Sequence, residues 1–327
     1  MAMGFRLARA ILCGWSMCNI ACAEAVDTRV VECIAPANAG GGWDLTCRAV
    51  GRILSELELV SGTVRVTNMP GAGGGVAFVH TVSQREADQN LIVAASSSTT
   101  LNLAQRLWGS LTERDVRWLG AVGAEYGALA VRADARWQHL GELVDEWRRN
   151  PTAIVVSGGS AVASQDHMKV LLLADAAGID ATRIRFVPFD GGGEAIAALL
   201  GGFVQLFSGD ASEMIAQLDA GNIRVLTVFA PERLGGRFAQ VPTARESGFD
   251  LEWINWRGLY VPAGISQQAY GAWLDKITAL GQSEAWRRAR EQTRLEPFFL
   301  IGTEFEQFVY HQVAAFRDMA REMGIIQ

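Results

Sequence analysis

Short apolar segments alternate with longer segments of helical periodicity along nearly the whole chain of 327 residues. Each apolar segment has the length and the residue types of a strand, and a helical stretch usually separates it from the next. This pattern predicts an α/β fold in which parallel sheets carry helices on both faces. The predicted strands are Val30–Ala35, Val64–Asn68, Leu91–Ala95, Trp118–Val122, Gly127–Val131, Ile154–Ser157, Ile184–Val187, Val204–Ser208, Arg224–Phe229 and Gly258–Val261.

The predicted helices fill the intervals between these strands and most of the C-terminal region. They are Leu45–Leu57, Val76–Gln84, Leu101–Leu107, Leu140–Arg149, Ser164–Ala177, Glu194–Leu200, Ser212–Ala220, Ala269–Gly281, Glu284–Gln292 and Glu304–Met323. Because 50% of the residues are apolar, the chain can bury a large core, and its length favours two domains.

Three of the predicted strands end in a glycine-rich loop that leads directly into a predicted helix. These strand–loop segments are residues 30–44, 153–164 and 184–193. At such a junction, unpaired backbone N–H groups and the positive end of the helix dipole point toward one place, which favours a bound anion. One junction of this kind is common in α/β proteins. Three of them suggest a ligand that carries several negative groups.

The glycine loops lack the spacing of nucleotide-binding and hydrolase motifs. Leu45 and Val76 stand where the third glycine of a dinucleotide fingerprint belongs, and neither lysine follows a glycine as in a phosphate-binding loop. Val162 replaces the last glycine of a serine-hydrolase elbow. The 4 histidines are too scattered along the chain for a zinc cluster. We therefore expect no enzyme, no cofactor and no metal site.

Residues 1–23 have the features of a secretory signal peptide. Arg6 and Arg9 precede an apolar stretch of about twelve residues, too short to span a bilayer, and small residues follow it. Cys22 raises a lipoprotein alternative, which Asn19 disfavours because an aliphatic residue is expected at that position. Loss of the signal leaves 27 basic and 35 acidic residues. This excess of acid makes nucleic acid a poor partner for the exported chain.

Cys33 and Cys47 are the two cysteines that remain after residues 1–23. Two cysteines in an exported protein favour a disulfide over a metal site. One lies on the first predicted strand and the other in the first turn of the next predicted helix, so the two can meet. Two small buried thiols fit the sequence equally well.

Polar residues beside the glycine loops are candidates for ligand contact, each with a structural alternative. Asp44 and Glu194 stand where an acidic side chain caps a helix, and capping is favoured over ligand contact. Trp43 either forms a cleft wall or packs against the neighbouring lobe. Residues 96–100 form a turn of five hydroxyl side chains, which can donate hydrogen bonds to a carboxylate. Asp210 either caps the next helix or holds a loop or a ligand hydroxyl.

Five motifs, in their order and spacing, resemble the substrate-binding proteins of tripartite tricarboxylate transporters, the Bug-type periplasmic receptors. The motifs are residues 36–44, 68–74, 158–167, 187–193 and 241–248. The likeness covers nearly all of the mature chain. The aromatic residue before Asp44, the Leu-Thr-Cys after it, and the Ser-Gln-Asp and Ser-Gly-Asp elements resemble the citrate-binding branch in particular. Phe189 and Asp190 depart from the Tyr-Lys pair that many family members carry there.

The resemblance implies a two-lobed periplasmic binding protein fold with two crossover strands and a ligand cleft between the lobes. We expect hinges at Gly127 and Gly258, which assign residues 26–127 and 258–327 to lobe 1 and residues 128–257 to lobe 2. The residues expected to contact the ligand are Gly41, Gly42, Trp43, Asp44, Ser96, Ser97, Ser98, Thr99, Gly158, Ser160, Ser164, Phe189, Gly191, Gly192, Gly193 and Asp210.

The implied ligand is citrate or a related di- or tricarboxylate. The implied partners are the large and small membrane subunits of a tripartite tricarboxylate transporter, to which the receptor delivers its ligand. A receptor for a smaller carboxylate or an amino acid is one alternative. A receptor that presents its ligand to a sensor kinase is another, because nothing in the sequence separates docking to a permease from docking to a sensor.

Overall fold

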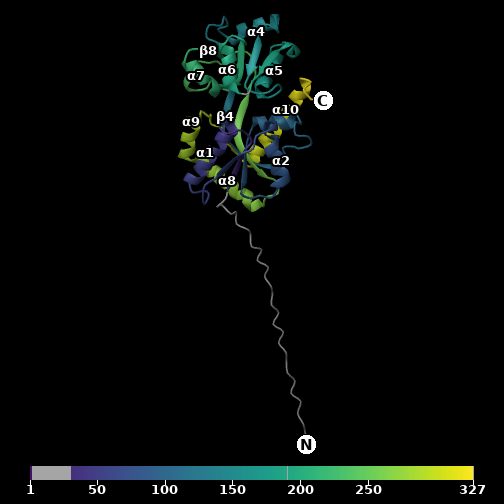
Figure 1. The fold of residues 1–327 in the computed structure, drawn as a ribbon, viewed down its shortest axis with the longest axis vertical. Coiled ribbons are helices and arrows are strands. Elements are labelled where there is room, and N and C mark those ends of the chain that lie inside the picture. The colour runs from purple at the N-terminus through teal and green to yellow at the C-terminus, as the bar shows by residue number, and fades with distance from the viewer. Residues whose placement is uncertain (2–30, 190, 327) are drawn as a thin grey trace.

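The computed structural model describes residue 1, residues 31–189 and residues 191–326. The expected signal peptide lies outside these residues except for residue 1, and so does Asp190. Figure 1 shows two groups of strands and helices joined by long strands at the centre of the molecule. The strands are β1 (Glu32–Ala35), β2 (Arg65–Asn68), β3 (Leu91–Ser96), β4 (Val116–Arg132), β5 (Val155–Gly158), β6 (Arg185–Pro188), β7 (Leu206–Asp210), β8 (Ile223–Val228), β9 (Ile254–Pro262) and β10 (Leu300–Ile301).

The helices cover both groups of strands. They are α1 (Gly42–Glu56), α2 (Gly75–Gln84), α3 (Ser97–Ala104), α4 (Leu140–Arg149), α5 (Gln165–Ala176), α6 (Gly192–Leu200), α7 (Ala211–Asp219), α8 (Gln267–Gln282), α9 (Glu284–Thr293) and α10 (Thr303–Glu322). Short 3₁₀ turns lie at Ala72–Gly74, Ala181–Arg183 and Gly236–Phe238.

The strands pair in the order β2-β1-β3-β9-β4-β7-β5-β6, and β8 and β10 also pair with β4. The pairs of β1 with β2 and β3, and of β5 with β6 and β7, are parallel. The predicted α/β class is therefore confirmed. The prediction of parallel sheets holds for these strands only, because β4 pairs antiparallel with β7, β8, β9 and β10.

Strand β4 corrects one prediction, because it joins two segments that the sequence separates. Trp118–Val122 and Gly127–Val131 belong to a single strand of 17 residues. Gly123 and the polar Glu125 interrupt the apolar pattern between them, but β9 pairs with this interval, with Gly123 opposite Arg257 and Glu125 opposite Asn255. Strand β9 accordingly begins at Ile254, earlier than its predicted start. The first part of β4 thus pairs with β9, and the part from Gly127 onward pairs with β7 and β8.

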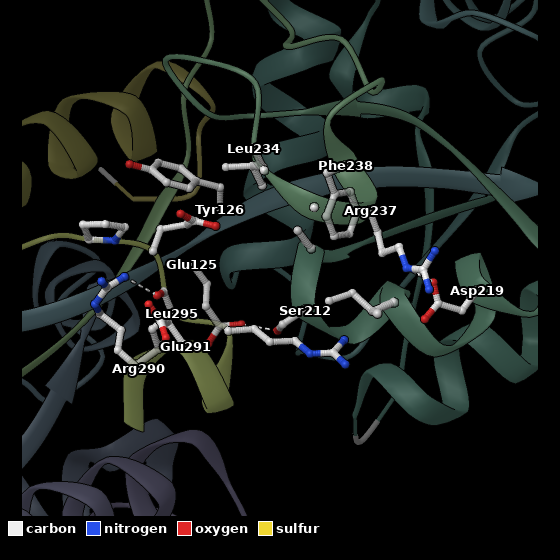
Figure 2. Close-up of a pocket in the computed structure, with 17 residues that line it drawn as sticks. Glu125, Tyr126, Ser212, Asp219, Leu234, Arg237, Phe238, Arg290, Glu291 and Leu295 are labelled. Atoms are coloured by element: carbon white, nitrogen blue, oxygen red, sulfur yellow. Dashed lines mark hydrogen bonds and ion pairs between the residues drawn. The ribbon is translucent and has the colours of Figure 1, made fainter. Parts of the chain in front are cut away.

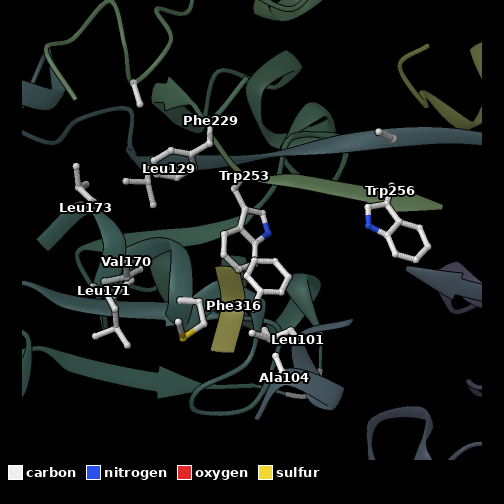
Figure 3. Close-up of a cluster of buried hydrophobic side chains, with 14 of the residues drawn as sticks. Leu101, Ala104, Leu129, Val170, Leu171, Leu173, Phe229, Trp253, Trp256 and Phe316 are labelled. Carbon is white, nitrogen blue, oxygen red and sulfur yellow. The ribbon is translucent and has the colours of Figure 1, made fainter. Parts of the chain in front are cut away.

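A continuous apolar core joins the two groups of strands on one side of these long strands. The indole of Trp253, just before β9, stacks on Phe316 of α10 with ring centroids 5.3 Å apart. The same cluster contains Leu101 of α3 together with Leu129 and Leu173 of the other group (Figure 3). In Figure 1, α10 and α5 lie on this side, and α1, α9 and α7 lie on the other. The second side is where the molecule is hollowed, as described below.

Cys33 and Cys47 form a disulfide in the structure, with their Cα atoms 5.7 Å apart. The bridge ties β1 to α1 and is fully buried. Of the two possibilities that the sequence leaves open, the structure contains the disulfide. Among the described residues, no helix combines the length and the apolar character needed to cross a membrane.

Candidate functional site

The first glycine loop leads into α1, which begins at Gly42 after the N-cap residue Gly41. Asp44, in the first turn, is buried and accepts hydrogen bonds from the backbone N–H of Gly40, from Arg48 and from Asn68, at 2.8 to 2.9 Å. The hydrogen bond from Arg48, with support from Gly40 and Asn68, outweighs burial and lowers the pKa of Asp44 to about 2. The Asp44 carboxylate thus holds the loop together.

Trp43 packs next to this loop. Its ring lies near Gly74, whose hypothetical Cβ would be 3.4 Å from the ring, and it contacts the apolar cluster under α1. This placement matches the packing alternative, although the partner loop belongs to the same group of strands. Gly42, in contrast, lies against the guanidinium of Arg257. A Cβ on Gly42 would be 2.9 Å from its Cζ, so the first helical residue of α1 faces a partly buried cation.

Residues 96–100 do not form the turn of free hydroxyls that the sequence suggests. Ser96 caps α3, which already begins at Ser97, and Ser96 and Thr99 exchange capping-box hydrogen bonds. Ser96, Ser97 and Thr99 are all buried. Ser97 Oγ donates to Asn255 at 2.9 Å, and the half-buried Ser98 donates to Gln165 of α5 at 3.2 Å. These hydroxyls make hydrogen bonds within the protein. Serine and threonine at a strand end favour the start of a helix as much as they favour a solvated turn.

The second and third glycine loops lie in direct contact. A Cβ on Gly159 would be 2.3 Å from the backbone nitrogen of Gly192, and Phe189 donates its N–H to the carbonyl of Gly158. Gly192 begins α6 after the N-cap residue Gly191, and Gly193 has open space where its side chain would be. The two loops therefore form one surface.

The serines of the second loop are engaged locally. Ser160 Oγ donates to Asp166 at 2.7 Å, and Ser164 Oγ donates to the carbonyl of Ala161 at 2.6 Å. Phe189 is half-buried and packs against the apolar cluster of its own group. The structure thus brings Gly158, Ser160, Gly191 and Gly192 near one another, but the two hydroxyls already have acceptors.

Asp210 belongs to a buried ionic network at the centre of the molecule. Lys169 Nζ lies 2.9 Å from Asp166 Oδ1 and 3.3 Å from Asp210 Oδ1, and all three side chains are buried. Asn255 donates to the other carboxylate oxygen of Asp210 at 2.7 Å and accepts from Ser97. Despite burial, the two carboxylates raise the pKa of Lys169, and Lys169 and Arg257 lower the pKa of Asp210. Both shifts favour the charged forms of Lys169 and Asp210.

A second ionic contact lies beside this network. Arg257 Nη2 is 2.7 Å from Glu125 Oε1, and the other carboxylate oxygen of Glu125 accepts a hydrogen bond from Ser212 in the first turn of α7. Arg257 and Glu125 retain 14% and 11% side-chain exposure. Glu213 follows Ser212, accepts from the N–H of Asp210 at 2.9 Å, and places its carboxylate against Gly192.

Glu213 as a residue is more exposed than Asp210 and Asp166, but its carboxylate packs against Gly192 and Gly209. Loss of solvent around this carboxylate and the like charges of Asp210 and Asp166 raise the pKa of Glu213 above its ordinary value. Glu213 thus gains a proton more easily than Asp210, whose pKa is lowered.

A pocket of about 720 Å³ opens next to these residues, on the side opposite the shared core. Figure 2 shows Glu125 close to Ser212 among the lining residues, with Arg290 and Glu291 of α9 and Leu295 of the following loop on one side. Its apolar walls include Tyr126, Phe238 and Leu295. A small adjoining cavity of about 50 Å³ is lined by Gly42, Arg257 and again Glu125 and Leu295, so Glu125 borders both spaces. The expected site residue Gly42 thus borders a cavity. The sequence did not predict that α9 contributes to the wall of the larger pocket.

Four charged residues at this centre were missed as site residues by reasoning from sequence: Lys169, Arg257, Glu125 and Glu213. Lys169 carries one usable signal, since it is one of only two lysines in the chain and directly precedes the apolar run Val170–Ala174. The other three have no local motif. They meet because β4, β9 and α7, far apart in sequence, lie side by side in the fold.

The tripartite tricarboxylate transporter family receptor model matches residues 50–325 of the chain. The protein BugT from Bordetella pertussis is 24% identical over 306 residues, which cover 92% of this chain and 91% of BugT.

Two solved structures show the same fold. Rpa4515 of Rhodopseudomonas palustris, determined with adipate, superposes with a TM-score of 0.77 at 21% identity, covering 91% of this chain and 98% of that chain. MatC from Rhodopseudomonas palustris, determined with bound malate, gives a TM-score of 0.72 at 20% identity, covering 89% of this chain and 98% of that chain. The expected periplasmic binding protein fold is confirmed by these likenesses.

Proposed function

Because the chain belongs to the tripartite tricarboxylate transporter receptor family, we propose that it is an exported receptor for a di- or tricarboxylate such as citrate. It binds this ligand between its two lobes and delivers it to a membrane transporter. The bound malate and adipate of MatC and Rpa4515 support a carboxylate as the ligand.

The observation that carries this proposal is that three helices begin next to the charged groups of Arg257, Glu125 and Glu213. α1 begins at Gly42 against Arg257, α7 begins next to Ser212, which contacts Glu125, and α6 begins at Gly192 against Glu213. Helix N-termini and a partly buried guanidinium favour negative groups even in a protein of net negative charge, because the local field dominates at short range. A polycarboxylate is the class of ligand that can use several of these donors at once.

We propose the two lobes and the hinge as the sequence analysis defines them, residues 26–127 with 258–327 and residues 128–257. The switch of pairing partners along β4 at Gly127 supports this division. The ligand lies between the first loop on one lobe and the joined second and third loops on the other, with Gly41, Gly42, Gly191, Gly192 and Gly193 offering backbone N–H groups. Closure about the hinge then brings both walls onto the ligand.

The proposed partners are the large and small membrane subunits of a tripartite tricarboxylate transporter. The family of the chain supports a transport role over ligand presentation to a sensor kinase. A gene for a large and one for a small membrane subunit next to the gene of this chain would agree with transport.

A thermal-shift screen tests the proposed ligand class. Citrate, malate and adipate are compared with a neutral sugar and an amine at millimolar concentrations. A ligand that binds only the folded state raises the melting temperature in proportion to the logarithm of its concentration. We expect such a rise with at least one carboxylate. A rise with the sugar or the amine alone would reject a carboxylate receptor.

A further inference from the structure

We propose that Arg257 is the cation that binds a ligand carboxylate, and that Glu125 occupies Arg257 as an internal carboxylate until the ligand displaces it. This inference rests on the proposed function and deepens it, because it names the ligand-binding cation and an internal competitor. Glu125 and Arg257 lie on the two strands, β4 and β9, that pass between the two groups of strands.

The partners of the Glu125 carboxylate are those that a bound carboxylate would need. One oxygen lies 2.7 Å from Arg257 Nη2 and 3.2 Å from its Nε, and the other accepts from the hydroxyl of Ser212 at the start of α7. The same guanidinium touches Gly42, the first residue of α1. A side-chain carboxylate thus sits among a guanidinium, a hydroxyl and two helix N-termini, which is a donor set suited to an anion.

The position of Glu125 allows the exchange. Its side chain borders both the small cavity beside Arg257 and the pocket of about 720 Å³, so its carboxylate has space to leave toward solvent. Arg257 would keep a carboxylate partner throughout, first Glu125 and then the ligand. Asp210 lies close enough to support the charge of Arg257 during the exchange. A charge on Arg257 is therefore compensated in both states.

An internal competitor lowers the apparent affinity for the ligand, because only the fraction of molecules with a free Arg257 is competent to bind. The competition also favours ligands whose carboxylate outcompetes a tethered one, which selects for several negative groups over a single one. Removal of the negative charge of Glu125 should then strengthen ligand binding. The opposite arrangement, in which Glu125 holds Arg257 in place for the ligand, predicts that the same change weakens it.

The decisive variant is Glu125→Gln, which keeps the size of the side chain and removes its charge. Binding of citrate, malate and adipate is measured by isothermal titration calorimetry on the wild-type mature chain and on the variant. We expect the carboxylate that binds the wild type to bind Glu125→Gln at least about fivefold more tightly, the lower end of typical coupling between sites. Glu291→Gln is the matched control, since Glu291 lines the same pocket but pairs with Arg287, and its affinity should equal that of the wild type.

Glu125→Asp provides a second test if Glu125→Gln does not fold. It keeps the charge but shortens the side chain by one methylene, so its carboxylate reaches Arg257 less well and competes less with the ligand. Glu125→Asp should therefore bind the ligand more tightly than the wild type does. Unchanged or weaker binding by whichever of the two variants folds would overturn the role of Glu125 while leaving the carboxylate receptor intact. Failure of the wild type and both variants to bind any carboxylate would instead overturn the proposed function, and this inference with it.

Discussion

Gly159 and Gly192 approach so closely that a Cβ on Gly159 would lie 2.3 Å from the backbone nitrogen of Gly192. The contact joins the loop after β5 to the start of α6. Because the atom in the way belongs to the backbone, it cannot turn aside as the end of a flexible side chain can. The absence of a side chain at residue 159 is therefore what allows two anion-favouring loops to form one wall.

Gly159→Ala should separate these two loops. We expect it to lower the free energy of unfolding by about 1–3 kcal/mol, as for other forced backbone shifts, and to weaken ligand binding. The control is Gly193→Ala, since a Cβ on Gly193 meets no atom within 4 Å. Urea unfolding and ligand titration of both variants check the expectation. Equal effects of the two substitutions would show that the close approach is unimportant.

Lys169→Met should be strongly destabilising, because it leaves Asp166 and Asp210 buried without their cation. Removal of one partner from a buried ionic contact costs about 3–5 kcal/mol. Lys276→Met is the matched control, since Lys276 is half-buried and donates to the neutral carbonyl of Leu59 rather than to a carboxylate. Its loss should cost about 1 kcal/mol. Urea unfolding of both variants at pH 7 measures the difference, and a small effect at Lys169 would contradict the buried network.

Asp44→Asn should reduce stability at neutral pH but much less in acid. The folded-state pKa of Asp44 is lowered from 3.8 to about 2, so its contribution is complete above 3.8 and is lost as the pH falls toward 2. We expect a loss of about 1–2 kcal/mol at pH 7. Unfolding is measured for the wild type and the variant between pH 7 and pH 2. The difference between their free energies of unfolding should become smaller below about pH 4. A gap independent of pH would be inconsistent with this assignment.

The disulfide of Cys33 and Cys47 should be present in the purified mature chain. Unfolding without reductant should then expose no thiol to a thiol reagent, and two thiols after reduction. The bridge has a sequence separation of 14, and closing such a loop stabilises by roughly 3 kcal/mol in the chain-entropy model. Reduction should lower the unfolding midpoint accordingly. Two titratable thiols in the unreduced protein would rule the bridge out.

The order of strands and helices could be predicted from the sequence because each element has a strong local pattern. The single strand β4 could not, because Gly123 and Glu125 break the apolar run and only pairing with β9 completes it. The start of α3 was missed for a related reason. Ser96 and its neighbours resemble a solvated turn locally, but burial and the capping box make them part of a helix.

The candidate site was predicted only in part. A glycine loop is recognisable from a few adjacent residues of the sequence. The predicted loops do lead into helices, which begin at Gly42 and Gly192. The contact of Arg257 with Glu125 depends on two strands more than a hundred residues apart in the chain, so no local spacing signals it. Lys169 was visible as a rare residue type, but its partner Asp210 is also distant in sequence.

The central claim is that this receptor binds a carboxylate between its lobes at Arg257. Calorimetric titration of the wild type and of Arg257→Gln with citrate, malate and adipate tests it most directly. We expect one carboxylate to bind the wild type with a stoichiometry of about one per chain, and Arg257→Gln to bind it at least about tenfold more weakly, because a charge-assisted hydrogen bond is lost. Binding of no carboxylate by the wild type, or equal affinity in the variant, would contradict the account.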